Sequence, residues 1–339
     1  MKIEDIHGIG KASIGIAKLL NTVKDFCIWT REFSRFKNIM AQLGDNDLKP
    51  DQINYETPNM KLALSGLNTK NKNPNHVEVY TEVALQSKEA QTLKEQLNKD
   101  KVLIYAANNL QDTTDVSEDK VDEEWLANFF EHTKFATSEY MQKLWGKILA
   151  DEVKQPNSYS IRALNTLRVL KKTDAEKFSK MCNLLLSNCN KTYHIVIYDS
   201  KYFYEKFNIT DSDLSYLEEI GLIQSTSLEY PAGILIDNDN AIFTYGGKKV
   251  FWYERKNLPA AFLDIPFFNI THLGKELLRL VIPEFQNDYI NVIHKNLIKQ
   301  NKEYKISVAD FNAIEFIENK LYVNRSYFTK LEPILETSV

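Results

Sequence analysis

Hydrophobic residues in the middle of the chain recur at intervals of three or four, the spacing of side chains that share one face of an α-helix. Four such faces follow one another, and they are formed by Trp125, Leu126, Phe129 and Phe130, by Met141, Leu144, Trp145, Ile148 and Leu149, by Ile161, Leu164, Leu167 and Leu170, and by Phe178, Met181, Cys182, Leu185 and Leu186. Thr173 and Glu176 have the spacing of a capping box, which places a helix start at Thr173. The pattern predicts an array of four helices within a helical domain over residues 77–190.

The core of this domain is expected to contain side chains from the first three helices. These residues are Trp125, Phe129, Leu144, Trp145, Ile148 and Arg162. Arg162 is included because a guanidinium among apolar positions can pair with a carboxylate such as Asp122 or Asp151 and fix how helices pack. The same interpretation applies to Arg168. An anion site is the alternative interpretation of these arginines.

Two segments and then one long helix precede the array of four helices. Residues 8–40 have helical spacing and hold six basic and two acidic residues, a net charge of +4, which predicts a basic amphipathic helix. Residues 41–76 are polar and rich in turn-forming residues, which indicates a linker. Helical spacing then resumes through Val79, Val83 and Leu93, so a long, solvent-exposed helix is expected to end near Leu110.

Beyond residue 190 the composition shifts towards β-branched and aromatic residues, which marks a second domain. The predicted elements are a strand at 193–198, a helix at 211–222, a hairpin at 241–253 with a two-residue turn at Gly246 and Gly247, and helices at 271–281 and 284–299. Helix, hairpin and closing helix in this order resemble winged-helix modules. The expected fold is mainly α with a smaller α+β part: the helical domain, a winged-helix-like domain over residues 191–300 and a C-terminal extension over residues 301–339.

Composition and charge narrow the class of protein. The chain has 339 residues, 43% of them hydrophobic, and a net charge of −4, which fits a globular protein and argues against a general nucleic-acid binder. No apolar stretch reaches the roughly 18 residues of a membrane-spanning helix. Three scattered cysteines and the absence of a signal peptide favour a reducing, cytoplasmic location.

The candidate chemical motifs have simpler structural explanations, so no catalytic residue, cofactor, metal site or small-molecule substrate is predicted. The glycines around Lys11 lack the spacing of a phosphate-binding loop. Cys182, Cys189 and His194 are not paired as zinc ligands are, and a core position is favoured for Cys182. The acids at residues 122–124 can serve a metal or acid/base site, but the dipole of the following helix also favours acids there.

Two clusters of basic residues are candidate contact surfaces. Near the hairpin, nucleic-acid phosphates can be contacted by Lys248, Lys249, Arg255 and Lys256. Nearby acids, among them Glu218 and Asp237, weaken that positive field and favour protein docking or dimerisation instead. In the N-terminal helix, a membrane or a partner can be contacted by Lys11, Lys18, Lys24, Trp29, Arg31 and Arg35. A peripheral position at the inner membrane therefore stays open beside packing against a protein.

Three motifs of the helical region point to a known family. They are Val121-Asp-Glu-Glu-Trp-Leu-Ala-Asn-Phe-Phe130, Met141-Gln-Lys-Leu-Trp-Gly-Lys-Ile-Leu-Ala-Asp-Glu-Val153 and Pro156-Asn-Ser-Tyr-Ser-Ile-Arg-Ala-Leu164. Together they resemble the bacterial family called domain of unknown function 2806, over about residues 77–285. Asp151 stands where members often have glycine, and Asn157 replaces another frequent glycine. The resemblance implies a bacterial or phage origin and a setting among accessory genes such as those of phage defence, but no activity or site residue.

The sequence favours a non-catalytic interaction or sensor protein, in a defence or stress response, whose helical domain assembles with itself or with a protein partner. A DNA-binding regulator that uses the winged-helix-like domain is the first alternative. A nuclease-like enzyme with an acidic site at Asp122, Glu123 and Glu124 is the second.

Overall fold

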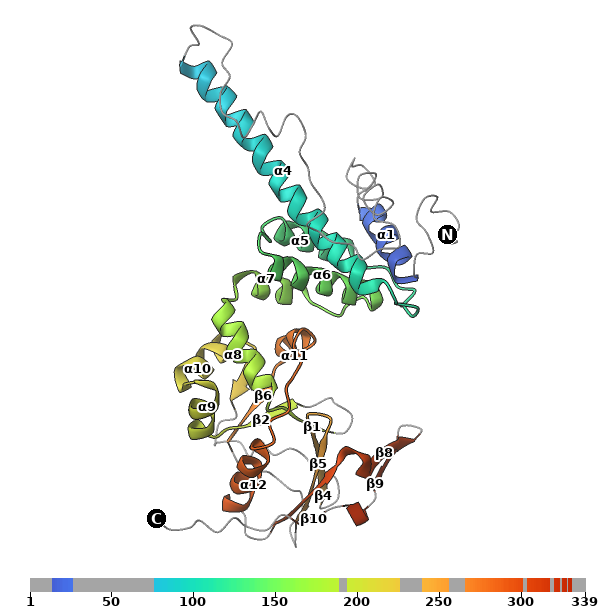
Figure 1. Cartoon of the computed structure of the whole chain (residues 1–339), viewed down its shortest axis with the longest axis vertical. Helices are drawn as coiled ribbons and strands as arrows, with labels where there is room; N and C mark the ends of the chain where they lie inside the picture. Colours follow the sequence, from blue (N-terminus) through green and yellow to red (C-terminus); the bar gives the residue numbers. More distant parts are fainter. Residues whose placement is uncertain are drawn as a thin grey trace. The chain divides into compact units, whose positions relative to one another are not determined.

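The computed structural model of the chain (Figure 1) describes residues 14–26, 76–188, 194–225, 240–255, 266–300, 304–317, 320–323, 325–327 and 329–330. It divides into two compact units, Met1–Arg168 and Val169–Val339. The second unit begins at Val169, before the boundary expected near residue 191. It therefore also contains the helix α8 (Lys172–Cys182), which packs against α10 (Asp211–Glu219).

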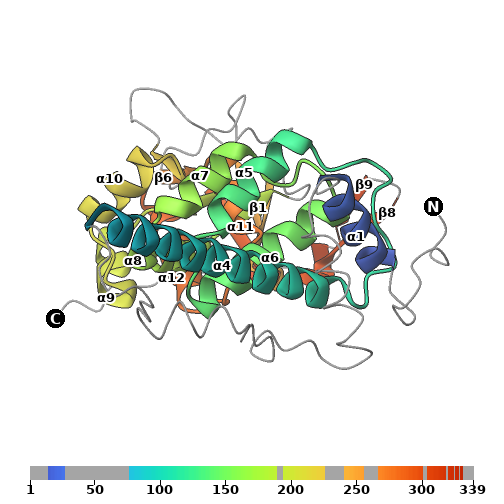
Figure 2. The same cartoon turned by 90° about the horizontal axis from the view of Figure 1, so that it is seen from above.

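The described part of the first unit is helical. Its helices are α1 (Ile14–Phe26), α4 (His76–Leu110), α5 (Glu123–Thr133), α6 (Glu139–Lys154) and α7 (Ile161–Val169). The α4 and α6 helices lie along one another, and α1 packs against both (Figure 2). Gly146 permits this approach, because a Cβ atom at that position of α6 would overlap Tyr105 of α4. The long helix predicted up to Leu110 is confirmed.

Aromatic side chains form the centre of the first unit. Trp125 stacks on Phe129 with ring centroids 5.2 Å apart, and Phe129 meets the edge of Trp145 at 5.6 Å. The indole N–H of Trp125 donates to the backbone oxygen of Tyr159 at 2.7 Å, so the buried ring has its hydrogen-bond partner. Ile148 is also buried. The helical spacing of the sequence therefore identified these core positions correctly.

Three local predictions for the helical array need correction or refinement. The Arg162 side chain is exposed and lies outside the core, and Leu144 is half-buried. Among the ion pairs of the described residues, none joins Arg162 or Arg168 to a carboxylate. The capping box at Thr173 is absent, because α8 begins at Lys172 and its N-cap makes no side-chain hydrogen bond.

The second unit combines helices with an antiparallel sheet, which confirms the mixed part of the predicted fold class. Its strands are β1 (Leu186–Asn188), β2 (His194–Ile197), β3 (Ile223–Ser225), β4 (Asn240–Tyr245), β5 (Lys249–Arg255), β6 (Phe267–Ile270), β7 (Tyr304–Asp310) and β10 (Thr329–Lys330). Within the described segments they form one sheet in the order β10-β7-β5-β4-β1-β2-β6-β3. A separate pair consists of β8 (Ile314–Ile317) and β9 (Lys320–Val323).

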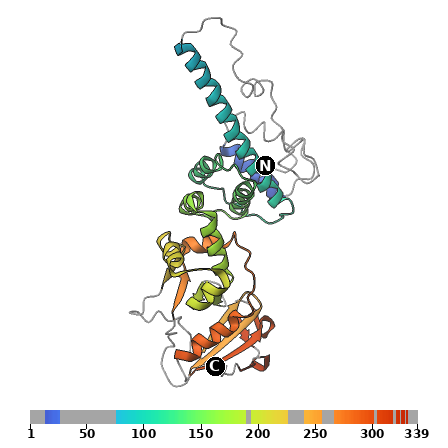
Figure 3. The same ribbon diagram turned by 60° about the vertical axis from the view of Figure 1, so that its left-hand side comes forward.

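The remaining helices of this unit are α9 (Ser200–Phe207), α10, α11 (His272–Leu278) and α12 (Tyr289–Gln300). Short 3-10 turns occupy Phe311–Ala313 and Arg325–Tyr327. Figure 3 shows α8, α9 and α12 around the sheet of the second unit.

The glycine-centred hairpin is confirmed, but it is not a free wing. Gly246 and Gly247 have φ of 56° and 64°, and the Tyr245 carbonyl accepts from the Lys248 N–H at 3.0 Å. Tyr245 pairs with Lys249, so three residues rather than two lie outside the ladder. Because β4 also pairs with β1, and β5 with β7, the hairpin lies inside the sheet. The winged-helix-like arrangement around this hairpin is not confirmed.

Candidate interaction surface

Two short helices, α9 and α10, are joined by a tight turn and form a helical corner in the second unit. Asp199 caps α9 by accepting from the Tyr202 N–H at 2.9 Å. The α9 helix ends at Asn208, whose left-handed φ of 55° redirects the chain. Thr210 and Asp213 form a reciprocal capping box at the start of α10. The helices are therefore separated by the three residues 208–210, the turn length of a helix-turn-helix.

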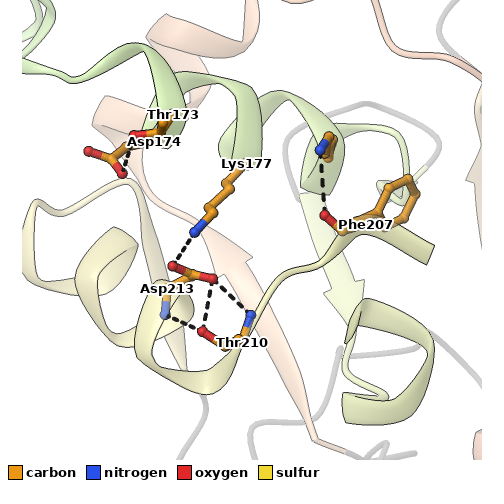
Figure 4. A network of polar contacts seen from close by, with 7 residues as sticks. Thr173, Asp174, Lys177, Phe207, Thr210 and Asp213 are labelled. Carbon is orange, nitrogen blue, oxygen red and sulfur yellow. Dashed lines mark hydrogen bonds and ion pairs between the residues drawn. The ribbon is translucent and has the colours of Figure 1, made fainter. Parts of the chain in front are cut away.

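An ion pair attaches this corner to α8. Figure 4 shows Lys177 of α8 reaching the carboxylate of Asp213, whose second oxygen accepts from the N–H and hydroxyl of Thr210 at 2.9 and 2.8 Å. Burial raises the pKa of the Asp213 carboxyl, but the hydrogen bonds from Lys177 and Thr210 outweigh it, and the pKa lies below its usual value. Asp213 therefore stays charged and holds the start of α10 against α8.

Three strands adjoin the helical corner formed by α9 and α10. The chain enters α9 from β2 and leaves α10 into β3, and β6 pairs with both strands. Gly221, with φ of 81°, ends the turn after α10. At Gly274, a Cβ atom would overlap the Leu222 carbonyl oxygen, so α11 closely approaches the backbone of the residue before β3. Thr271 caps α11 by accepting from the Gly274 N–H at 3.0 Å.

The α10 helix carries carboxylates and no basic residue. Its sequence, Asp-Ser-Asp-Leu-Ser-Tyr-Leu-Glu-Glu, contains four acids, of which Asp211 and Glu219 are exposed. Glu218 is turned towards β3, where it accepts from the N–H and hydroxyl of Ser225 at 2.7 Å. Leu214 and Leu217 are buried underneath. The outer face of α10 is therefore negatively charged and polar.

Two of the four basic residues predicted near the hairpin, Lys248 and Lys249, make contacts within the protein. Lys249 pairs with Asp310 of β7 at 2.6 Å, and the Lys248 ammonium lies 5.1 Å from the centre of the Phe285 ring. Arg255 is the last residue of β5, and Lys256 lies outside the described residues. The structure brings only Lys248 and Lys249 to the turn, where a neighbouring carboxylate offsets one of the two charges.

The N-terminal helix uses its apolar face inside the first unit. Leu19, Leu20 and Val23 are buried, and the Lys18 ammonium donates to the Ser117 carbonyl at 2.5 Å. Lys24 is exposed, whereas Lys11, Trp29, Arg31 and Arg35 lie outside the described residues. These apolar residues of α1 therefore pack inside the first unit. Among the described helices, none is both long and apolar enough to cross a bilayer.

The acids and cysteines that the sequence suggested for catalysis or metal binding form no such site among the described residues. Asp122 caps α5 by accepting from the Trp125 N–H at 2.8 Å, while Glu123 and Glu124 are exposed in the first turn. Cys182 is buried, which raises the pKa of its thiol, and Cys189 is not among the described residues. A search of the described part of the chain finds no group of three acidic, histidine or cysteine side chains that could hold a metal.

Comparison with known protein families finds one match. A family model described as protein of unknown function (DUF2806) matches residues 84–294, more than half of the chain. The chain belongs to the DUF2806 family. No curated protein and no solved structure matches it. The expected resemblance is therefore shown, and the DUF2806 match spans most of α4 to the middle of α12, across both units.

Two acids at the end of α6 anchor the loop between α6 and α7, a contact that sequence reasoning missed. Glu152, 2% exposed, accepts from the N–H groups of Asn157 and Tyr159 at 2.6 and 3.0 Å. Asp151 accepts from the Tyr159 hydroxyl at 3.0 Å. Asn157 has φ of 68°, the left-handed region that favours glycine. The sequence signal that could have identified this anchor is an acidic residue, the one directly after Asp151, on a helix face whose other residues are apolar.

Proposed function

We propose that this chain is a non-catalytic interaction protein whose second unit is a winged-helix-like module that docks a protein. The sequence of elements α8, β2, α9, α10, β3 and β6 supports the module, because α9 and α10 form a helix-turn-helix and β6 lies between β2 and β3 in the sheet. In such modules the second helix of the pair, here α10, makes the main contact. The segment between β3 and β6 includes the β4–β5 hairpin, which in this chain is paired within the sheet instead of forming a free wing.

The charge of α10 is the observation that carries the proposal. DNA recognition through this helix would bring Asp211 and Glu219 against the phosphates, whereas nucleic-acid affinity depends largely on Lys and Arg that displace counterions. A protein surface rich in Lys and Arg offers the complementary charge and can also cover the partly exposed ring of Tyr216. The expected partner of α10 is therefore a basic protein surface.

A DNA-binding regulator that uses the hairpin is the alternative, and a mobility-shift assay separates the two. The full-length protein is expected to leave a duplex of about 30 base pairs unshifted even at about 50 mM salt, where phosphate contacts are strongest. A shift that disappears on changing both Lys248 and Lys249 to Glu would instead establish the regulator.

Site-directed photo-cross-linking in the source cell tests docking directly. A photoreactive residue placed at Ser212 or Ser215, both exposed on α10, is expected to form a discrete protein adduct. The same residue at Asn291, exposed on α12, is the control and should form none. In the Ser215 protein, Glu219→Lys should reduce the adduct at least several-fold. Adducts that are equal at all three positions, or indifferent to Glu219→Lys, would refute docking through α10.

The biological setting in phage defence or a stress response is part of the same proposal. It rests on the family resemblance and not on any described residue. Deleting the gene and challenging the cells with phage tests it, with a chain carrying Glu219→Lys as the comparison. Unchanged phage sensitivity after deletion would remove this setting.

A further inference from the structure

The first half of α4 extends beyond the packed part of the first unit. Burial begins only near Asn98, whereas Glu89, Gln91, Thr92 and Lys94 are exposed. Figures 1 and 3 show this end of α4 projecting past α5 and α6. The helix has 35 residues, and only its last third contributes to the core. Because helices are stabilised mainly by packing, the remaining turns are expected to pack against something else.

The projecting turns carry an apolar stripe with the spacing of a coiled coil. Ala90, Leu93 and Leu97 follow one another at intervals of three and four residues, and all three are half-buried rather than covered. In the sequence the same alternation continues back to Val83 and Val79, with a polar residue at 86 as one interruption. Apolar positions a and d of a heptad have this spacing. Ala90 and Leu97 then occupy a positions, and Leu93 a d position.

The charges beside the stripe specify its partner and orientation. Glu89 precedes the a position of Ala90 and is a g residue, and Lys94 follows the d position of Leu93 and is an e residue. Both are exposed, and no ion pair within the described residues involves either one. In a parallel pair of identical helices, a g residue meets the e residue five positions later on the other helix. Glu89 of one copy therefore meets Lys94 of the second.

We propose that a second copy of this chain pairs with the projecting half of α4 as a parallel, in-register coiled coil. The antiparallel arrangement would put g beside g and e beside e, so that acids face acids and lysines face lysines. Self-pairing is consistent with charge only in the parallel orientation. Because α4 is already continuous with the folded unit, association does not have to nucleate a helix.

The contact is expected to be weak. The stripe spans fewer than the three to four heptads of a stable isolated coiled coil, and it includes the small side chain of Ala90 and a polar residue at 86. A dissociation constant in the micromolar range, on the order of 1–100 µM, is therefore expected. Dimers should appear on concentration and disappear on dilution.

Cysteine cross-linking tests the register. In full-length protein with Cys27 and Cys189 changed to Ser, Ala90→Cys places a thiol at the position that faces itself across a parallel pair. Mild oxidation should give a disulfide-linked dimer. Lys88→Cys, on the exposed opposite side of α4, is the matched control and should give at least several-fold less. Equal cross-linking at both positions, or none at Ala90→Cys, would overturn the proposal.

A charge exchange tests the orientation by sedimentation velocity up to about 100 µM. Glu89→Lys and Lys94→Glu should each weaken dimerisation about tenfold, and the double exchange should restore it, because the pair is re-formed with reversed signs. A chain that stays monomeric at every concentration would show that other residues of the same chain, or nothing, cover the stripe. Dimers whose affinity is not restored by the double exchange would exclude the parallel register. Both results would overturn the proposal.

The inference goes beyond the proposed function and does not depend on it. The two fail separately, because sedimentation and the residue-90 disulfide report on α4, while cross-linking from Ser215 reports on α10.

Discussion

Replacing Glu152 is the most direct test of how the first unit is held together. This carboxylate is buried at the end of α6 and accepts from two backbone N–H groups of the following loop, those of Asn157 and Tyr159. The loop in turn places the Tyr159 carbonyl against the indole N–H of Trp125. Glu152→Ala would therefore leave the buried Tyr159 N–H and the part-buried Asn157 N–H without their acceptor and loosen the contact to the aromatic core.

The size of the effect follows from the number of bonds. Each hydrogen bond to a charged acceptor contributes about 1.5–3 kcal/mol, so the loss of both in Glu152→Ala should lower the free energy of unfolding by at most about 3–6 kcal/mol. For a unit of this size, that corresponds to a fall in Tm of roughly 6–20 °C. Glu152→Gln keeps one acceptor oxygen and should have about half the effect.

Calorimetry and tryptophan fluorescence measure the change, because Trp125 and Trp145 both lie in the first unit. Glu139→Gln on the same helix is the control. Its carboxylate pairs with Lys143 at the surface, so Tm should change by less than about 2 °C. A loss of less than about 1 kcal/mol for Glu152→Ala would refute the view that this carboxylate anchors the loop.

Three further predictions concern single positions. Gly274→Ala should destabilise the second unit by about 1–3 kcal/mol in urea unfolding, because the new Cβ overlaps the Leu222 carbonyl, whereas Gly247→Ala meets no atom and adds only its backbone strain. Asn157→Gly should be close to neutral and Asn157→Val should lose about 1–2 kcal/mol in the same assay, since only the former suits a positive φ. Burial lowers the pKa of His132, so the unfolded chain takes up a proton first and the first unit should lose stability as the pH falls below about 6.5. His132→Gln should flatten that pH dependence of urea unfolding.

Each of these has a clear contrary result. Equal losses for the two glycine variants would mean that the close approach of α11 to β3 does not limit residue 274. Equal stability of the glycine and valine variants at residue 157 would remove the backbone explanation. A His132→Gln protein with an unchanged pH profile would show that other groups dominate acid destabilisation.

Periodicity predicted the first three helices of the array well because each one buries a single apolar face, but it carried the fourth too far, since α8 ends at Cys182 and Leu186 begins β1. Trp125, Phe129, Trp145 and Ile148 are core residues whose spacing alone indicates their side of the helix. Arg162 shows the limit of that argument, because a residue flanked by apolar neighbours still faces solvent when it lies a third of a turn away from the buried stripe.

Pairings between distant segments could not be predicted. The Gly246-Gly247 turn was visible locally, yet nothing in the hairpin indicates that β4 also pairs with β1 and β5 with β7. Likewise, Lys177 meets Asp213, 36 positions away, only because α8 folds back on α10. The charge of α10 was readable from the sequence, but its position directly after α9, across a three-residue turn, required the structure.

The pairing of β7 with β5 and the packing of α1 have a practical consequence for recombinant work. A fragment trimmed to the family match, residues 84–294, would lack both elements. Its α4 and α6 would present the bare apolar surface that α1 now covers, and β5 would become an unprotected edge with unsatisfied amides. Such a fragment is expected to aggregate, so the limits of sequence similarity are not the limits of a soluble folding unit.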